Sequence, residues 1–130
     1  MILTTSALRA LWRNEADASL LHTAIMRAPV RAISAATVVD AALLLLGERQ
    51  GGVDLELDAL LRELEVTVLP FTESQAHRAR EAARTFGAGR HSAALGFGDC
   101  MAYALAIESG EPVLAVGEAF VGTDVERVAY

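Results

Sequence analysis

The sequence predicts an α/β protein in which helices cover both faces of a central, mostly parallel sheet of four to five strands. Two observations predict this fold. Short apolar segments typical of buried strands alternate with longer segments whose apolar residues recur at helical spacing. The chain has 130 residues without linkers or low-complexity stretches, which fits one domain. We therefore expect three layers, α/β/α, over residues 1–130.

The first half of the chain contains two predicted strands and four predicted helices. The strands are residues 1–3 and 30–34, and the helices are residues 7–13, 15–28, 35–49 and 53–64. Thr5 or Ser6 can cap the first helix, and Pro29 ends the second. Gly51 and Gly52 separate the third helix from the fourth, whose leucines follow one face.

The second half contains two predicted helices and two or three predicted strands. Residues 66–69 are rich in β-branched side chains, which favours a strand ended by Pro70. Thr72 and Gln75 form a capping-box pattern that predicts a helix to about Phe86. A loop follows to residue 98, then a helix over 99–109. Residues 112–116 and 125–128 are predicted as the last strands.

Charge and cysteine content exclude several classes of protein. The net charge of -6 disfavours a passive electrostatic nucleic-acid binder, which is normally basic, but not a nuclease with a carboxylate site. Cys100 is the only cysteine, so neither an intrachain disulfide nor a cysteine metal cluster is possible. No apolar run approaches the roughly 20 residues of a membrane helix. Without an export signal at the N-terminus, we expect a cytoplasmic protein.

Isolated acids lie where parallel strands are expected to end. Asp40 and Asp99 are each the only charged residue of a long apolar stretch, residues 32–47 and 91–107. Glu118 follows the strand "PVLAV" and one glycine, and Asp124 lies six residues further on. Several buried carboxylates together are costly unless a cation neutralises them. Mg²⁺ and Mn²⁺ prefer such oxygen ligands.

Each of these acids also has a purely structural explanation. Asp99 can cap the helix that it opens. Asp40 can form an internal capping pair with Thr37, and Glu118 can be an ordinary loop acid. Spacing alone leaves an acidic metal site and a plain α/β domain both open.

The stretches around these acids resemble the PIN-domain ribonucleases, in particular the VapC-type toxins of bacterial toxin–antitoxin pairs. The resemblance rests on "TSAL" after the first strand, "ISAATVVDAALLL", "RTFGAGRHSAALGFGDCMAYALA" and "PVLAVGEAFVGTDV". The third stretch is similar to the family pattern "fGkGrHpAaLNfGDCfaYALA" and is the most specific.

The resemblance implies a Mg²⁺- or Mn²⁺-dependent endoribonuclease of PIN-like α/β/α fold, a homodimer neutralised by a VapB-like antitoxin. Asp99 matches the family's central metal-ligand aspartate, and Asp40 occupies a position usually filled by Glu. Glu118 is the third candidate catalytic acid, with Thr5, Ser6 and Asp124 in supporting positions. Two residues, Arg84 and Arg90, are candidate contacts to RNA phosphates, although the arginines of residues 78–90 also fit a solvated helix face.

The largest departure from the family is Thr4, which stands where the pattern "hydrophobic–Asp–Thr–Ser–Ala" has a metal-binding Asp. Losing about 3 kcal/mol of attraction lowers metal affinity about 150-fold. We therefore expect weak metal binding and low or absent nuclease activity. Thr4 is compatible with an introduced inactivating change and with a naturally degenerate site. The alternative function is a catalytically retired PIN domain that binds an antitoxin or RNA.

Overall fold

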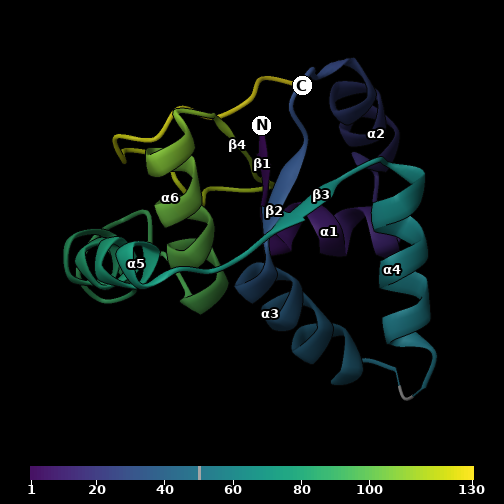
Figure 1. Ribbon diagram of the computed structural model, residues 1–130, viewed down its shortest axis with the longest axis horizontal. Helices are drawn as coiled ribbons and strands as arrows, with labels where there is room; N and C mark the ends of the chain where they lie inside the picture. The colour runs from purple at the N-terminus through teal and green to yellow at the C-terminus, as the bar shows by residue number, and fades with distance from the viewer. Residues whose placement is uncertain (50) are drawn as a thin grey trace.

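The structure, a computed structural model, describes residues 1–49 and 51–130 and has a parallel sheet at its centre (Figure 1). The strands are β1 (Ile2–Leu3), β2 (Ala32–Ser34), β3 (Thr67–Leu69) and β4 (Val113–Leu114). Their order in the sheet is β3-β2-β1-β4, and every pairing is parallel. The chain therefore has the largely parallel sheet expected from alternating strands and helices.

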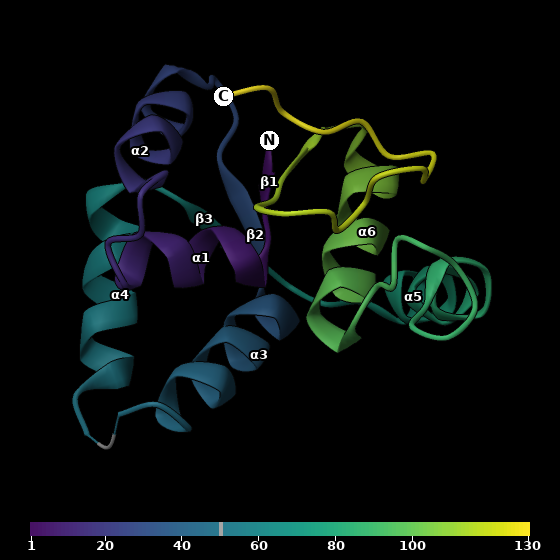
Figure 2. The same cartoon turned by 180° about the vertical axis from the view of Figure 1, so that it is seen from behind.

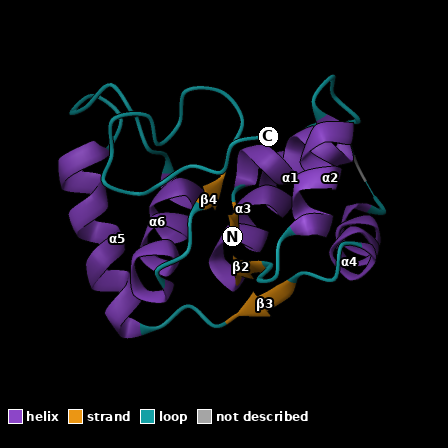
Figure 3. Cartoon of the chain, turned by 90° about the horizontal axis from the view of Figure 1, so that it is seen from above, coloured by secondary structure: helices purple, strands orange, loops and turns teal. Residues whose placement is uncertain are grey.

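Helices cover both faces of this sheet. They are α1 (Thr5–Trp12), α2 (Ala18–Arg27), α3 (Ala35–Leu46), α4 (Val53–Glu63), α5 (Glu73–Phe86) and α6 (Phe97–Ser109). Seen from above, α5 and α6 lie on one side of the strands, and α1, α2 and α4 lie on the other (Figure 3). Helix α3 continues from the end of β2, below the sheet in Figure 1 and in the reverse view of Figure 2. The predicted α/β/α architecture is confirmed.

The alternation of side chains along the strands builds the two halves of the core. Ile2, Ala32 and Val113 pack in the cluster that includes α5 and α6. Their neighbours Leu3, Ile33 and Leu114 pack in the cluster that includes α1 and α2. Because successive side chains of a strand point to opposite faces, even two-residue strands contribute to both layers.

Several predicted boundaries differ from those of the structure. Helix α2 begins at Ala18 rather than at residue 15, and α3 ends at Leu46 rather than at residue 49. The predicted strand over 112–116 shortens to β4. The predicted strand over 125–128 is a single bridge between Val113 and Arg127. Helix α5 follows its prediction, since the Thr72 hydroxyl accepts a hydrogen bond from the Gln75 N–H at 3.2 Å.

One predicted helix cap is wrong, and a second is shifted by three residues. Helix α1 is capped by Thr4, whose hydroxyl accepts from the Ala7 N–H, and not by Thr5 or Ser6. The hydroxyls of both residues are engaged elsewhere, since Ser6 accepts from the Val116 N–H and Thr5 donates to Asp40. Helix α6 begins at Phe97 with Gly96 as its N-cap, and Asp99 takes part in the cap from the first turn, since its carboxylate accepts from the Gly96 N–H. None of the described helices has the length and apolar character needed to cross a membrane.

Candidate metal centre

Asp40 and Asp99 come together at the carboxyl edge of the sheet. Asp40 lies in the second turn of α3, which directly follows β2, and Asp99 lies in the first turn of α6. Both side chains are half-buried. Ligands of parallel α/β folds bind at this edge, where loops and helix starts meet. Two acids from distant parts of the sequence therefore occupy the expected place for a site.

Gly98 allows this close approach. A Cβ at position 98 would lie 2.1 Å from Asp40 Oδ2 and 2.5 Å from Thr5 Oγ1. The Thr37 hydroxyl donates to the Gly98 carbonyl at 3.4 Å, so it joins α3 to α6 and does not pair with Asp40 as a cap. The start of α6 thus packs against Asp40 through a position that has no side chain.

Each acid is held through one carboxylate oxygen. The Thr5 hydroxyl donates to Asp40 Oδ2 at 2.7 Å, and the Gly96 N–H donates to Asp99 Oδ2 at 3.3 Å. Within residues 1–49 and 51–130, no hydrogen bond reaches Oδ1 of either acid. One oxygen of each carboxylate is therefore available to a ligand.

The electrostatics of the pair favour a cation. Burial raises the pKa of Asp99, the hydrogen bond from Gly96 lowers it, and the negative charge of Asp40 raises it again. The ionised pair is thus unfavourable on its own, and a divalent cation would offset the repulsion. The donors are all oxygens, which suits Mg²⁺ or Mn²⁺. The carboxylates of Asp40 and Asp99 and the hydroxyl of Thr5 fit such an ion, but they are fewer ligands than a tight site requires.

Thr4, at the position of the family's first acid, is engaged with the sheet. It is fully buried, and its hydroxyl donates to the Leu114 carbonyl at 2.8 Å. The same oxygen lies 3.0 Å from the Ser6 hydroxyl. These contacts join the end of β1 to β4. The Thr4 side chain therefore stabilises the junction of two strands and adds no negative charge to the acid pair.

Glu118 and Asp124 lie in the exposed segment that follows β4. Among the described residues, no group of three His, Cys, Asp or Glu side chains could hold a metal, so Glu118 does not complete a cluster with Asp40 and Asp99. Asp124 accepts hydrogen bonds from the Tyr103 hydroxyl at 2.9 and 3.2 Å. The segment itself is braced by Arg127, which donates to the Ala115 and Gly117 carbonyls.

The two arginines predicted to contact RNA lie on the α5 side of the molecule. Arg84 is exposed in the last turn of α5, and Arg90 is exposed in the loop between α5 and α6. Neither forms an ion pair within the part of the chain that the structure describes. Both cations are therefore free to meet an anionic ligand.

The sequence interpretation missed the roles of Gly98 and Thr5 at Asp40. The signal for Gly98 was present in "GFGDC", since glycine is unfavourable inside a helix and stands directly before the central acid. The hydrogen bond from Thr5 to Asp40 had no local signal, because it joins residues 35 positions apart. Such a contact follows only from the packing of α1 against α3.

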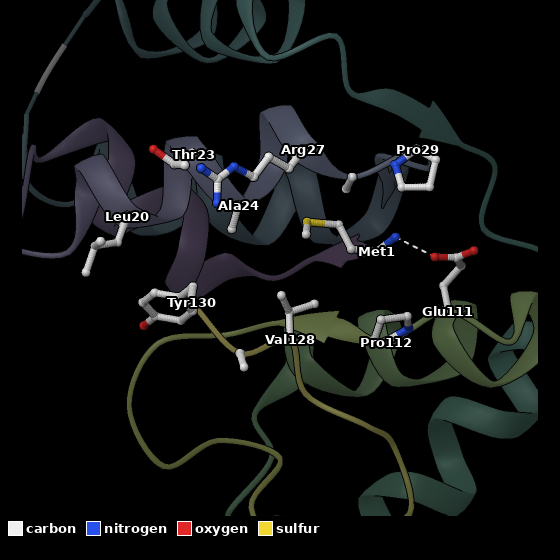
Figure 4. A pocket seen from close by; sticks show the side chains of 12 residues that line it. Met1, Leu20, Thr23, Ala24, Arg27, Pro29, Glu111, Pro112, Val128 and Tyr130 are labelled. Carbon is white, nitrogen blue, oxygen red and sulfur yellow. Dashed lines mark hydrogen bonds and ion pairs between the residues drawn. The ribbon is translucent and has the colours of Figure 1, made fainter.

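A second concave region lies at the opposite, amino-terminal edge of the sheet (Figure 4). This cavity of about 440 Å³ lies between α2, the start of β1 and the C-terminal segment, with Leu20, Arg27 and Tyr130 in its wall. Its one ion pair joins the Met1 amino group to Glu111 at 2.5 Å. The cavity lacks a carboxylate pair, so the acid pair at the other edge is the better candidate for catalysis.

Replacing Gly98 with alanine is expected to lower the free energy of unfolding by about 1–3 kcal/mol, because the new methyl group would displace Asp40 and Thr5. Denaturant unfolding measures this effect. Gly96→Ala is the steric control, since a Cβ there meets nothing closer than 3.9 Å, and its own loss should be only the modest cost of alanine at the N-cap of α6. Adding Asp40→Ala to Gly98→Ala should reduce the loss. Equal losses in the presence and absence of the Asp40 side chain would contradict the proposed contact.

Comparison with known proteins covers nearly the whole chain. The PIN domain family model matches residues 1–126. Ribonuclease VapC28 of Mycobacterium tuberculosis is 44% identical over 128 residues, which are 98% of this chain and 96% of that protein. Ribonuclease VapC of Mycolicibacterium smegmatis is 44% identical over 131 residues, which cover 98% of this chain and 99% of that protein.

A solved structure supports the fold independently. The crystal structure of Mycobacterium tuberculosis VapC20, described there as a sarcin–ricin loop cleaving toxin, matches with a TM-score of 0.79. The match covers 99% of this chain and 98% of that one, at 17% sequence identity. At this identity the likeness concerns the arrangement of helices and strands alone.

Proposed function

The chain belongs to the VapC ribonucleases of the PIN domain family, and from this premise we propose that it is a divalent-metal-dependent endoribonuclease toxin weakened by Thr4. The observation that carries the proposal is the pair of half-buried acids, Asp40 and Asp99, beside Gly98 at the carboxyl edge of the sheet. In the proposal, Mg²⁺ or Mn²⁺ is held by one oxygen of each acid.

Each residue of the site has a proposed role. When bound, the divalent ion supplies a Lewis acid that activates water and neutralises charge at the phosphodiester. Asp99 is the main ligand and Asp40 the second, oriented by the hydrogen bond from Thr5. Glu118 reaches the substrate from the exposed segment after β4. Arg84 and Arg90 bind RNA phosphates as cations without ion-pair partners in the described chain.

The proposed substrate and partners follow from the relatives. RNA is the substrate, and the toxin acts in the cytoplasm as a homodimer until a VapB-like antitoxin neutralises it. The relatives named VapC ribonucleases support the RNA substrate and, through their family, the antitoxin. An antitoxin would cover the acidic site and exclude RNA from it.

One observation favours a second candidate function, a retired nuclease that binds antitoxin or RNA without cutting. The Thr4 hydroxyl donates to Leu114 and adds no charge to the site. Among the residues that the structure describes, only the carboxylates of Asp40 and Asp99 would then bind the metal. A protein of this kind would keep the fold and the binding surfaces of the family. It would bind millimolar Mn²⁺ too weakly for calorimetric detection.

The two candidates are separated by RNA cleavage and calorimetric titration with Mn²⁺. The nuclease proposal expects slow cleavage in Mn²⁺, none in EDTA, and a large loss of cleavage and metal binding in Asp40→Asn. Asp58→Asn, an exposed acid of α4, is the matched control and should behave as the parent chain. The absence of both Mn²⁺ binding and cleavage in the parent chain would favour the retired binding protein.

A further inference from the structure

An apolar cavity of about 340 Å³ lies between α5 and α6, at the start of α6. On the α5 side, its wall is formed by the small side chains Ala76, Ala79 and Ala83. On the α6 side, the wall includes Phe97 and Cys100. The volume is at the lower end of the range for small-molecule sites. The alanines leave room for one planar group.

Phe97 is exposed at the edge of this cavity. Its relative exposure is 67%, which is second to that of Leu55 among the large hydrophobic side chains of the described residues. An aromatic ring left in water offers a surface on which a nucleobase can stack. Phe97 and Asp99 lie two positions apart in the first turn of α6, where side chains do not face each other, so the connection from the cavity to the central acid runs through Gly96.

A hydrogen bond connects the cavity to the acid pair. Gly96 lines the cavity, and its N–H donates to Asp99 Oδ2 at 3.3 Å. The wall of the cavity and the central acid are therefore parts of the same helix start. An occupant of the cavity would place any group attached to it near the carboxylates.

Cations at the rim define the chemistry of the occupant. Arg80 lines the cavity, and Arg84 lies one turn further along the same face of α5. Both are exposed, and neither forms an ion pair with a described residue. A planar apolar group next to negative charge is the signature of a nucleotide. An apolar side chain of a protein partner would fill the cavity but would not need the two cations.

We propose that this cavity, the base pocket, holds one unstacked base of the RNA substrate, stacked on Phe97, while Arg80 and Arg84 bind the adjoining phosphates. The inference rests on the proposed nuclease function and specifies its substrate. The lining is largely carbon and offers few groups to read a base edge, so the pocket selects an unpaired nucleotide and not one base identity.

The test measures binding of a single-stranded RNA carrying one 2-aminopurine to the full chain in EDTA, which makes it independent of metal and cleavage. Binding should quench the fluorescent base, and Phe97→Ala should weaken binding about 5- to 100-fold, whereas Phe97→Tyr should preserve it. Ala83→Leu, which fills the pocket from an exposed position, should weaken binding similarly. Ala59→Leu on exposed α4 is the matched control and should bind as the parent chain.

The outcomes separate this inference from the proposed function. Unchanged RNA binding in both Phe97→Ala and Ala83→Leu would overturn the base pocket, even if cleavage in Mn²⁺ remains. Quenching without any Mn²⁺-dependent cleavage would support the pocket and count against the nuclease. If the two variants instead lose only the binding of a short acidic peptide carrying one tryptophan, the cavity serves a protein partner and the inference fails.

Discussion

Thr4→Asp is expected to raise Mn²⁺ affinity about 150-fold, since an added carboxylate near the ion contributes a net of about 3 kcal/mol. RNA cleavage in Mn²⁺ should rise with it. Position 4 directly follows β1 and is fully buried, next to β4 and at the start of α1. The new charge would therefore be added at the carboxyl edge where Asp40 and Asp99 meet. Calorimetry and cleavage of single-stranded RNA measure the two effects.

The same substitution should destabilise the metal-free protein. Thr4 donates its hydroxyl proton to the Leu114 carbonyl, and a carboxylate cannot donate one. A buried carboxylate facing a carbonyl oxygen is costly without a cation. The melting temperature in EDTA should fall, and Mn²⁺ should raise it more than in the parent chain, because a ligand that binds only the folded state stabilises that state.

Thr4→Asn is the control for this prediction. Asparagine is close in shape to aspartate, but its amide N–H can still donate to the Leu114 carbonyl and it adds no charge, so this variant should not raise Mn²⁺ affinity and should be more stable in EDTA than Thr4→Asp. Equal Mn²⁺ affinity in Thr4→Asp and Thr4→Asn would show that a charge at position 4 does not reach the metal. The role of Thr4 would then be the structural one seen in its contact with β4.

The sequence was informative where local patterns decide the structure. The alternation of Ile2 and Leu3 between the two faces follows from strand geometry, and α5 follows from the cap at Thr72. The positions of Asp40 in the helix that follows β2 and of Asp99 near the start of a helix could be predicted for the same reason. In a parallel sheet the order of elements determines which segments reach the carboxyl edge.

Other features depended on contacts between distant residues. Spacing predicts that the hydroxyl of Thr5 or Ser6 caps the first helix, but Thr5 contacts Asp40 and Ser6 contacts Val116 across the fold. The sequence also predicts that Glu118 converges with the other acids, but Glu118 is exposed in the segment after β4, which Arg127 braces. Competition among several partners for one hydroxyl cannot be resolved from spacing alone.

Asp99→Asn is expected to lower Mn²⁺ affinity at least 100-fold and to abolish cleavage, even in the Thr4→Asp background, because it removes the charge of the central acid. The free energy of unfolding of the metal-free protein, in contrast, should not fall. An asparagine oxygen can still accept the hydrogen bond from Gly96, while the repulsion from Asp40 disappears. In EDTA at neutral pH, the variant should therefore be at least as stable as the parent chain.

The pH dependence of stability distinguishes this site from a simple helix end. Burial and Asp40 raise the pKa of Asp99 in the folded state. The protonated Asp99 therefore makes its full contribution to the free energy of unfolding below the unfolded pKa of about 3.9. This contribution is lost as pH rises through the folded pKa. The difference in unfolding free energy between Asp99→Asn and the parent should grow across this range.

The control is Asp54→Asn, which changes an exposed acid in the first turn of α4 and should show no such growth. Lower stability of Asp99→Asn at every pH, with unchanged Mn²⁺ affinity, would show that Asp99 only stabilises the start of α6.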